Sequence, residues 1–297
     1  MTSTIHEDLI GAEIKYYSTA KYRTRVIEWV SERIPLILMH GGGGHAEAYS
    51  RNIARLSRVC SPTALDFLWH GLSSRPKYWE GSRREGRHWL NQFTDQVLDL
   101  MDAKGIDKAV FEGESLGGWI AVDLGVNHPD RVAGLILNTA WGITLDPRFV
   151  KESKGDLEAL RRTSLDALEA PTPEKIRRRM EWLMPLGGTT DEIVEVRRKI
   201  WQIPETRDAL TEYYNRLFSA STAEALFTEA DIARIRARTL VLWTDHNPFQ
   251  GVDAAERIAS VMPSSTLKVI QGAGHWPQWE KPEEHDAAVE DFLKSLG

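Results

Sequence analysis

Short apolar runs recur in the first and last parts of the chain. Continuous runs of this kind are typical of strands buried on both faces of a parallel sheet. They lie at residues 36–39, 108–112, 132–137, 239–243 and 267–270, and residues 58–67 hold a further predicted strand. Two earlier stretches, residues 13–17 and 24–30, have the pattern of half-buried strands and predict a hairpin. The pattern therefore predicts an α/β protein with a mostly parallel central sheet.

Segments between these runs carry apolar residues at helical spacing. The predicted helices cover residues 46–57, 89–104, 119–126, 252–262 and 282–296. Gly105 follows the second of them and is a natural C-terminal cap.

The middle of the chain has a different pattern. Residues 143–225 contain almost no strand-like run, and prolines separate their charged amphipathic segments. Helices are expected at residues 155–169, 173–184, 190–201 and 205–218. The sequence therefore predicts a core built from residues 1–142 and 226–297, with residues 143–225 inserted as a helical cap.

Composition narrows the class of protein. Of 297 residues, 42% are hydrophobic and 27% charged, and the net charge of −6 argues against nucleic acid or an anionic membrane as partner. Cys60 is the only cysteine, which excludes an intrachain disulfide and a cysteine metal cluster. No secretory signal begins the chain, and no apolar run approaches the roughly 20 residues that span a bilayer. We expect a cytoplasmic protein.

Residues 113–118, Gly-Glu-Ser-Leu-Gly-Gly, join a predicted strand to a predicted helix. A serine at the apex of such a turn is strained and exposed, and the flanking glycines avoid clashes between strand and helix. The alternative is a plain glycine-rich turn, which the rest of the chain makes less attractive. Ser115 is therefore the candidate nucleophile.

Residues 40–45, His-Gly-Gly-Gly-Gly-His, follow another buried strand directly. Gly41, Gly42 and Gly43 allow the backbone to approach a ligand closely. Because open α/β sheets bind ligands at the carboxyl ends of their strands, this loop should face the same cleft as Ser115. No Gly-Lys-Ser/Thr follows, so an oxyanion is a better ligand than a phosphate. We interpret His45 as a loop histidine rather than a metal ligand.

Two further loops follow later strands. Residues 245–247 carry an acid and an amide, and His275 lies in a Gly-x-Gly-His loop after the last strand. The order serine, acid, histidine is that of the α/β-hydrolase arrangement. His275 would take the Ser115 proton, and the backbone N–H groups of Gly42 and Leu116 would bind the developing oxyanion.

At these residues the sequence resembles the α/β-hydrolase superfamily, and more narrowly the meta-cleavage-product hydrolases. Those enzymes split a carbon–carbon bond in 2-hydroxy-6-oxo-dienoates made by ring-opening of catechols. The resemblance covers nearly the whole chain. It includes the loop at 40–43, the turn at residues 113–118 (the elbow), the helical cap and residues 274–280, Gly-His-Trp-Pro-Gln-Trp-Glu.

The resemblance implies further site residues. An arginine on a cap helix binds the dienoate carboxylate in that family, and Arg197 lies at the similar place. A guanidinium suits a planar carboxylate, although a solvated cap arginine is the alternative. Trp276 matches the tryptophan after the family's histidine and is a plausible pocket wall. Glu114 stands where the family has a polar-site asparagine, and glutamate there is common in ester hydrolases.

The acid position also differs from the family pattern. Alignment on the preceding strand and His275 places Asn247, not aspartate, at this position. An amide can orient the imidazole but cannot stabilise the imidazolium by charge. Asp245 lies two residues earlier, and because each extended residue advances about 3.3 Å, it can replace Asn247 only if the loop is reshaped.

Three functions follow from these features. The first is serine-dependent cleavage of a carbon–carbon bond in a 2-hydroxy-6-oxo-dienoate. The second is hydrolysis of an aromatic or terpenoid ester or lactone, which Glu114 favours. The third is a non-catalytic small-molecule receptor, which Asn247 favours. None of them implies a metal, nucleotide, flavin or other cofactor, and the resemblance implies that the chain can form homo-oligomers.

Overall fold

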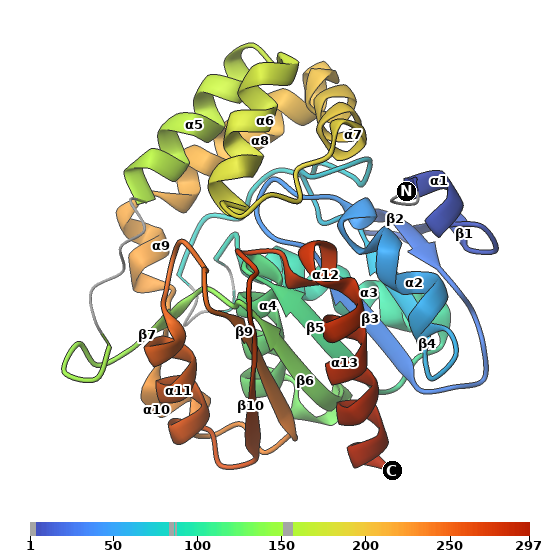
Figure 1. The fold of residues 1–297 in the computed structure, drawn as a ribbon, viewed down its shortest axis with the longest axis vertical. Helices are drawn as coiled ribbons and strands as arrows, with labels where there is room; N and C mark the ends of the chain where they lie inside the picture. Colours follow the sequence, from blue (N-terminus) through green and yellow to red (C-terminus); the bar gives the residue numbers. More distant parts are fainter. Residues whose placement is uncertain (1–3, 83–85, 87, 151–156) are drawn as a thin grey trace.

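An eight-stranded sheet runs through the centre of the computed structural model, which describes residues 4–82, 86, 88–150 and 157–297 (Figure 1). The strand order is β1-β2-β4-β3-β5-β6-β9-β10. Pairing is antiparallel between β1 and β2 and between β2 and β4, and it is parallel from β4 to β10. The predicted mostly parallel α/β architecture is therefore confirmed.

The strands of this sheet lie where the apolar runs predicted them. Their bounds are β1 (Glu13–Ser18), β2 (Arg23–Glu28), β3 (Pro35–Met39), β4 (Ser61–Leu65), β5 (Ala109–Glu114), β6 (Val132–Asn138), β9 (Thr239–Thr244) and β10 (Ser265–Ile270). Strands β5 and β9 are buried along their whole length, as expected for strands covered on both faces.

Helices cover both faces of the sheet. They are α1 (Ile5–Asp8), α2 (Ser50–Leu56), α3 (Asn91–Lys104), α4 (Leu116–Asn127), α10 (Glu229–Ile232), α11 (Val252–Val261), α12 (Pro277–Glu280) and α13 (Pro282–Leu296), with 3₁₀ turns at Ala46–Tyr49 and Pro129–Arg131. Helix α2 packs with α13, and α3 packs with α4 (Figure 1). The single helix predicted for residues 46–57 instead begins as a 3₁₀ turn. Gly105 ends α3 in the left-handed conformation, as predicted.

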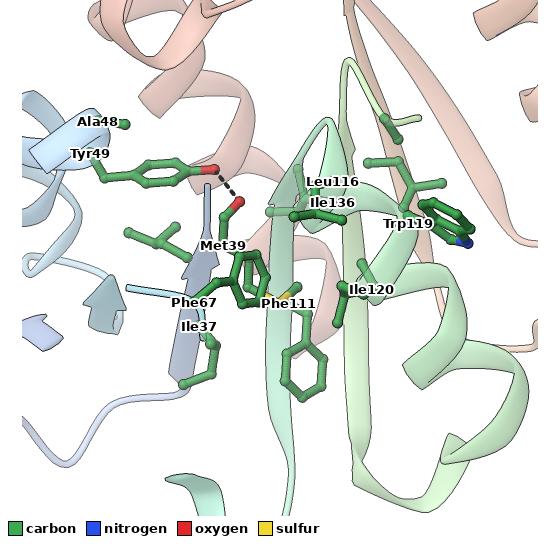
Figure 2. Packing of buried hydrophobic residues seen from close by; sticks show 14 of the residues in the cluster. Ile37, Met39, Ala48, Tyr49, Phe67, Phe111, Leu116, Trp119, Ile120 and Ile136 are labelled. Carbon is green, nitrogen blue, oxygen red and sulfur yellow. Dashed lines mark hydrogen bonds between the residues drawn. The ribbon is translucent and has the colours of Figure 1, made fainter. Parts of the chain in front are cut away.

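Apolar side chains from the sheet and its helices form one continuous core (Figure 2). Met39 and Phe111 from central strands lie beside Ile120 from helix α4 in this view, Trp119 of the same helix lies further out, and all four are buried. Tyr49 is also buried and donates its hydroxyl hydrogen to the Met39 carbonyl oxygen at 3.3 Å. The end of β3, which leads into the glycine loop, is therefore fixed from within the core.

A helical segment lies beyond the carboxyl ends of the central parallel strands (Figure 1). It contains α5 (Leu157–Glu169), α6 (Pro173–Leu183), α7 (Asp191–Gln202), α8 (Pro204–Leu217) and α9 (Ala220–Glu224). Its ends are joined by β7 (Ile143–Thr144) and β8 (Phe227–Thr228), which pair in parallel. Residues 155 and 156 of the first predicted helix lie outside the described residues. No helix in the described ranges has the length and apolar character needed to cross a bilayer.

Strand register brings several loops to the same edge of the sheet. Met39 of β3 pairs with Gly113 of β5, and Glu114 pairs with Asn138 of β6. On the far side, Thr244 of β9 pairs with Ile270 of β10. Because these strands are parallel and end together, the loops that follow them converge at the edge that faces the helical segment.

Candidate active site

Ser115 lies at the sharp turn between β5 and α4. Its backbone has φ 53° and ψ −110°, a conformation that residues other than glycine rarely adopt. A Cβ on Gly113 would clash with the backbone of Gly117, and a Cβ on Gly117 would clash with the Met39 carbonyl. The two glycines thus permit a turn that projects the serine side chain from the edge of the sheet.

The glycine loop after β3 is held from both sides. His40 accepts a hydrogen bond from the Phe67 N–H at Nε2 (3.1 Å) and donates from Nδ1 to the Gly41 carbonyl (2.7 Å). Burial holds the pKa of His40 well below its ordinary value, which suits this neutral, two-sided role. From the helical segment, Tyr214 donates to the Gly42 carbonyl (3.2 Å) and Trp201 to that of Gly43 (3.3 Å).

Two backbone N–H groups of the site are available to a ligand. That of Gly42 has no hydrogen-bond acceptor among the described residues. That of Leu116 is the first of helix α4, so no residue of the helix can accept it. Both residues line one cavity together with Ser115. This arrangement suits a negative oxygen that develops next to the serine.

His275 is buried in the loop after β10. Its Nδ1 lies 2.9 Å from Asn247 Oδ1, so the expected contact between this amide and the imidazole is present. Its backbone N–H donates to the Leu183 carbonyl of the helical segment at 2.8 Å, and its carbonyl accepts from the Thr139 hydroxyl at 2.9 Å. The ring is therefore positioned by the core and by the helical segment together.

The structure does not bring Asp245 to the His275 imidazole. Asp245 Oδ1 accepts from the backbone N–H groups of Gly272 (2.8 Å) and Ala273 (3.3 Å), and it also contacts His246. Burial opposes ionisation of Asp245, but the hydrogen bonds from His246 and the backbone keep its pKa below the ordinary value. Its carboxylate fixes the histidine loop rather than the histidine ring.

The Glu114 carboxylate contacts the other side of the His275 ring. Glu114 Oε1 lies 3.0 Å from His275 Nε2, and Glu114 Oε2 accepts the Gly41 N–H at 2.6 Å. The first contact has ion-pair distance but not hydrogen-bond geometry, since neither atom has a hydrogen-bond partner among the described residues. Over the same residues, Ser115 Oγ makes no hydrogen bond to His275. The sequence did not predict this use of Glu114, because it placed that residue with the substrate.

Arg197 and Arg179 of the helical segment are buried, and neither forms an ion pair within the described part of the chain. Arg197 is fully buried, and none of its guanidinium nitrogens has a hydrogen-bond partner among the described residues. Its guanidinium carbon lies 5.0 Å from the centre of the Trp276 ring. Burial, followed by the charge of Arg179, lowers the pKa of Arg197 to about 10. Arg179 itself is 2% exposed.

Arg179 was missed by the sequence analysis, although a signal was present. It lies on the apolar face of α6 with Ile176, Met180 and Leu183, all of which are buried. Arg197 likewise lies on the buried face of α7. An arginine at an apolar position of an amphipathic helix is the pattern that would have identified both.

The cavity wall joins the elbow, the glycine loop and the helical segment. The predicted site residues that line it are Ser115, His275, Glu114, Gly41, Gly42, Leu116 and Trp276, and Arg179, Tyr213 and Tyr214 add polar groups from the helical segment. The predicted site residues Gly43, Asn247, Asp245 and Arg197 do not line it. Within the described part of the chain, no three His, Cys, Asp or Glu side chains are arranged to hold a metal ion.

Comparison with known proteins identifies the fold family. A family model described as the alpha/beta hydrolase fold matches residues 34–282. The chain is 26% identical over 291 residues to a 2-hydroxymuconate semialdehyde hydrolase from Pseudomonas putida, covering 96% of this chain and 94% of that one. It is also 26% identical to a 1-acylglycerol-3-phosphate O-acyltransferase from Sus scrofa, covering 90% and 79%.

A solved structure shares the fold. The 2-hydroxy-6-oxo-6-phenylhexa-2,4-dienoate hydrolase from a Rhodococcus species superimposes with a TM-score of 0.80. That comparison covers 95% of this chain and 99% of the other, with 20% sequence identity.

Proposed function

The chain belongs to the α/β-hydrolase fold family, and from this premise we propose that it is a serine-dependent hydrolase that cleaves a carbon–carbon bond in a 2-hydroxy-6-oxo-dienoate. The observation that carries the proposal is the strained Ser115, which shares one cavity with His275 and the N–H groups of Gly42 and Leu116. The activity named for the relative from Pseudomonas putida is of the same class.

In this reaction the enol form of the substrate ketonises in the cavity. Ser115 Oγ then attacks the C6 carbonyl carbon, and the oxygen becomes an oxyanion held by the backbone of Gly42 and Leu116. Breakage of the bond between C5 and C6 releases the dienoate fragment, which takes up a proton. Water hydrolyses the ester left on Ser115 and restores the free serine.

His275 accepts the Ser115 proton in this scheme. Two other residues together replace the acidic member of a catalytic triad. Asn247 orients the ring through Nδ1, as an amide can. Glu114 supplies a negative charge beside Nε2, where the proton arrives. The imidazolium is therefore stabilised from the side of Ser115 rather than from the 245–247 loop.

Residues 143–225 serve as a lid on the core formed by residues 1–142 and 226–297. Three hydrogen bonds support this role, because they join the helical segment to the catalytic loops. Leu183 accepts the His275 N–H, Tyr214 donates to Gly42, and Trp201 donates to Gly43. Opening the lid would loosen the loops that hold the nucleophile's partners.

Arg197 binds the substrate carboxylate at the lid, with Trp276 as the wall between them. The support is electrostatic, because a fully buried guanidinium without a hydrogen-bond partner among the described residues is strongly disfavoured until an anion arrives. Trp276 lines the cavity and lies 5.0 Å from the Arg197 guanidinium carbon, so Arg197 is next to the residues that a ligand would contact.

Hydrolysis of a carboxylic ester is the second candidate. It is favoured by Glu114, which fills the position of the family's polar asparagine with a carboxylate that is turned toward His275. The same serine, histidine and oxyanion donors would serve this reaction.

The test compares two substrates and one variant. The purified protein is given a yellow 2-hydroxy-6-oxo-dienoate and a chromogenic aryl ester, and both are followed by absorbance. Loss of the dienoate colour at a rate well above that of ester cleavage supports the carbon–carbon assignment. Ser115→Ala should lower both rates by several orders of magnitude, and more than about a tenth of the activity retained would exclude Ser115 as nucleophile.

A further inference from the structure

Arg179 lies on the lid side of the cavity with part of its guanidinium unused. Its Nε donates to Ser164 Oγ of helix α5 at 2.8 Å. Its Nη1 is buried and has no hydrogen-bond partner among the described residues. Ser164 therefore fixes the orientation of the guanidinium, and the remaining N–H groups are left for a molecule in the cavity.

No acidic side chain in the described ranges neutralises Arg179. Over the described residues it forms no ion pair, whereas its helix neighbour Arg177 pairs with Asp191. Arg197 acts on it electrostatically, but that charge has the same sign. Glu114 stabilises the charge of Arg197 from a distance while its own oxygens face Gly41 and His275. Arg179 is therefore a charged residue of the cavity wall that has no ion-pair partner among the described residues.

The surroundings of Arg179 in the cavity are apolar. They include Leu157, Leu160, Leu183, Leu217 and Phe218. A single cationic side chain in such an apolar lining favours a ligand whose hydrocarbon chain ends in an acidic group. A substrate whose end near Arg179 is a plain hydrocarbon would keep the guanidinium desolvated and unpaired, which is strongly disfavoured.

From these contacts we propose that the cavity accepts a substrate with two acidic groups, a dicarboxylate whose second carboxylate binds Arg179 while its first is directed to Arg197. The inference rests on the proposed function, because that function assigns the first carboxylate to Arg197. It adds the chemical class of the other end of the substrate. The Ser164 hydroxyl is a positioning group that holds Arg179 for this contact.

Binding is measured by calorimetry in full-length protein carrying Ser115→Ala, so that no turnover occurs. The probes are linear dicarboxylates from succinate to azelate and the monocarboxylates of the same chain lengths. At the best length, the dicarboxylate should bind about tenfold or more tightly than its monocarboxylate. Arg179→Met should remove that difference. The matched control Arg178→Met, which changes the exposed neighbour on the same helix, should retain it.

Equal affinity of mono- and dicarboxylates at every length would overturn the inference, whatever Arg179→Met does to folding. Tighter binding of methyl phosphate than of every dicarboxylate would also overturn it, because the two arginines would then form one compact anion site. Turnover by the unmodified protein distinguishes failure of the inference from failure of the proposed function. Dienoate turnover without a preference for a second acid refutes the inference alone, and diacid binding without turnover of any dienoate or ester refutes the function alone.

Discussion

Glu114 Oε1 lies 3.0 Å from His275 Nε2, on the opposite side of the imidazole from Asn247. The negative charge beside the histidine therefore comes from the residue that precedes Ser115 and not from the loop after β9. Gly41 fixes this arrangement, because its N–H binds Glu114 Oε2 and a Cβ on Gly41 would lie 2.5 Å from that oxygen. The absence of a side chain at position 41 thus leaves room for the Glu114 carboxylate.

Glu114→Gln should lower kcat by about 10²-fold or more, with a smaller effect on KM, because the imidazolium formed during turnover loses its counter-charge. Asn247→Asp alone should change kcat by less than about tenfold, since Glu114 already provides the charge. In the double variant, Asn247→Asp should recover most of the activity lost in Glu114→Gln. Steady-state kinetics on the preferred substrate measures all three.

The two alternatives give different results in the same experiment. If Asn247→Asp alone raises kcat sharply, the chain lacks a working acid and Glu114 has a different role. If Glu114→Gln is fully active, its carboxylate contributes nothing to turnover. Nitrogen-15 NMR of the His275 ring supplies a second measurement, because loss of Glu114 should change the Nε2 resonance even where the fold is intact.

Arg197→Ala should raise KM strongly for substrates that carry a carboxylate and leave neutral esters nearly unchanged. The reason is that a bidentate guanidinium–carboxylate pair is lost only for the acids. Arg198→Ala is the matched control, because Arg198 is paired with Glu195 at 2.6 Å on the outer face of the same helix. Equal loss on acids and esters would assign Arg197 to the packing of the lid.

The fold was predictable because its signals are local. Continuous apolar runs predict buried parallel strands, and prolines with helical periodicity predict the inserted helices. The elbow around Ser115 was also predictable, since a Cβ at Gly113 or Gly117 is excluded by the backbone opposite it.

Side-chain direction at the site was not predictable in the same way. Glu114 lies at the end of β5, and its carboxylate can reach His275 only because the loop after β10, far away in the sequence, returns to it. Asp245 and Asn247 are two residues apart, and the backbone N–H groups of Gly272 and Ala273 decide which of them faces the ring. Such contacts depend on tertiary structure rather than on spacing.

Gly42→Ala should lower kcat by up to about 10²-fold, because the new methyl group displaces the oxyanion loop. An added Cβ would lie 2.5 Å from the hydroxyl oxygen of Tyr213, which is buried in the lid. Tyr213→Phe removes that oxygen and should restore most of the activity in the double variant. Tyr214→Phe is the control, since the Tyr214 hydroxyl binds the Gly42 carbonyl and not the position of the methyl group. Equal rescue by both changes would point to general loosening of the lid.

A buried charge network beneath the site should make folding stability depend on alkaline pH. His285 Nε2 lies 2.6 Å from Glu112 Oε1, and its Nδ1 lies 2.9 Å from Asp286 Oδ1. Burial by itself would lower the pKa of His285, but the two carboxylates raise it to about 10. The pKa of an unfolded histidine is about 6.5. The protonated ring therefore stabilises the folded state fully below about pH 6.5, and this stabilisation is lost as the pH rises toward 10.

The free energy of unfolding should accordingly fall by on the order of a few kcal/mol between about pH 7 and about pH 10, as measured by denaturant titration. His285→Gln should be less stable at neutral pH and should lose most of that slope, because no proton is then bound on folding at this position. His6→Gln changes an exposed histidine and should keep the slope of the unmodified protein. A slope that persists unchanged in His285→Gln would mean that His285 is neutral in the folded state and that Glu112 or Asp286 carries its proton.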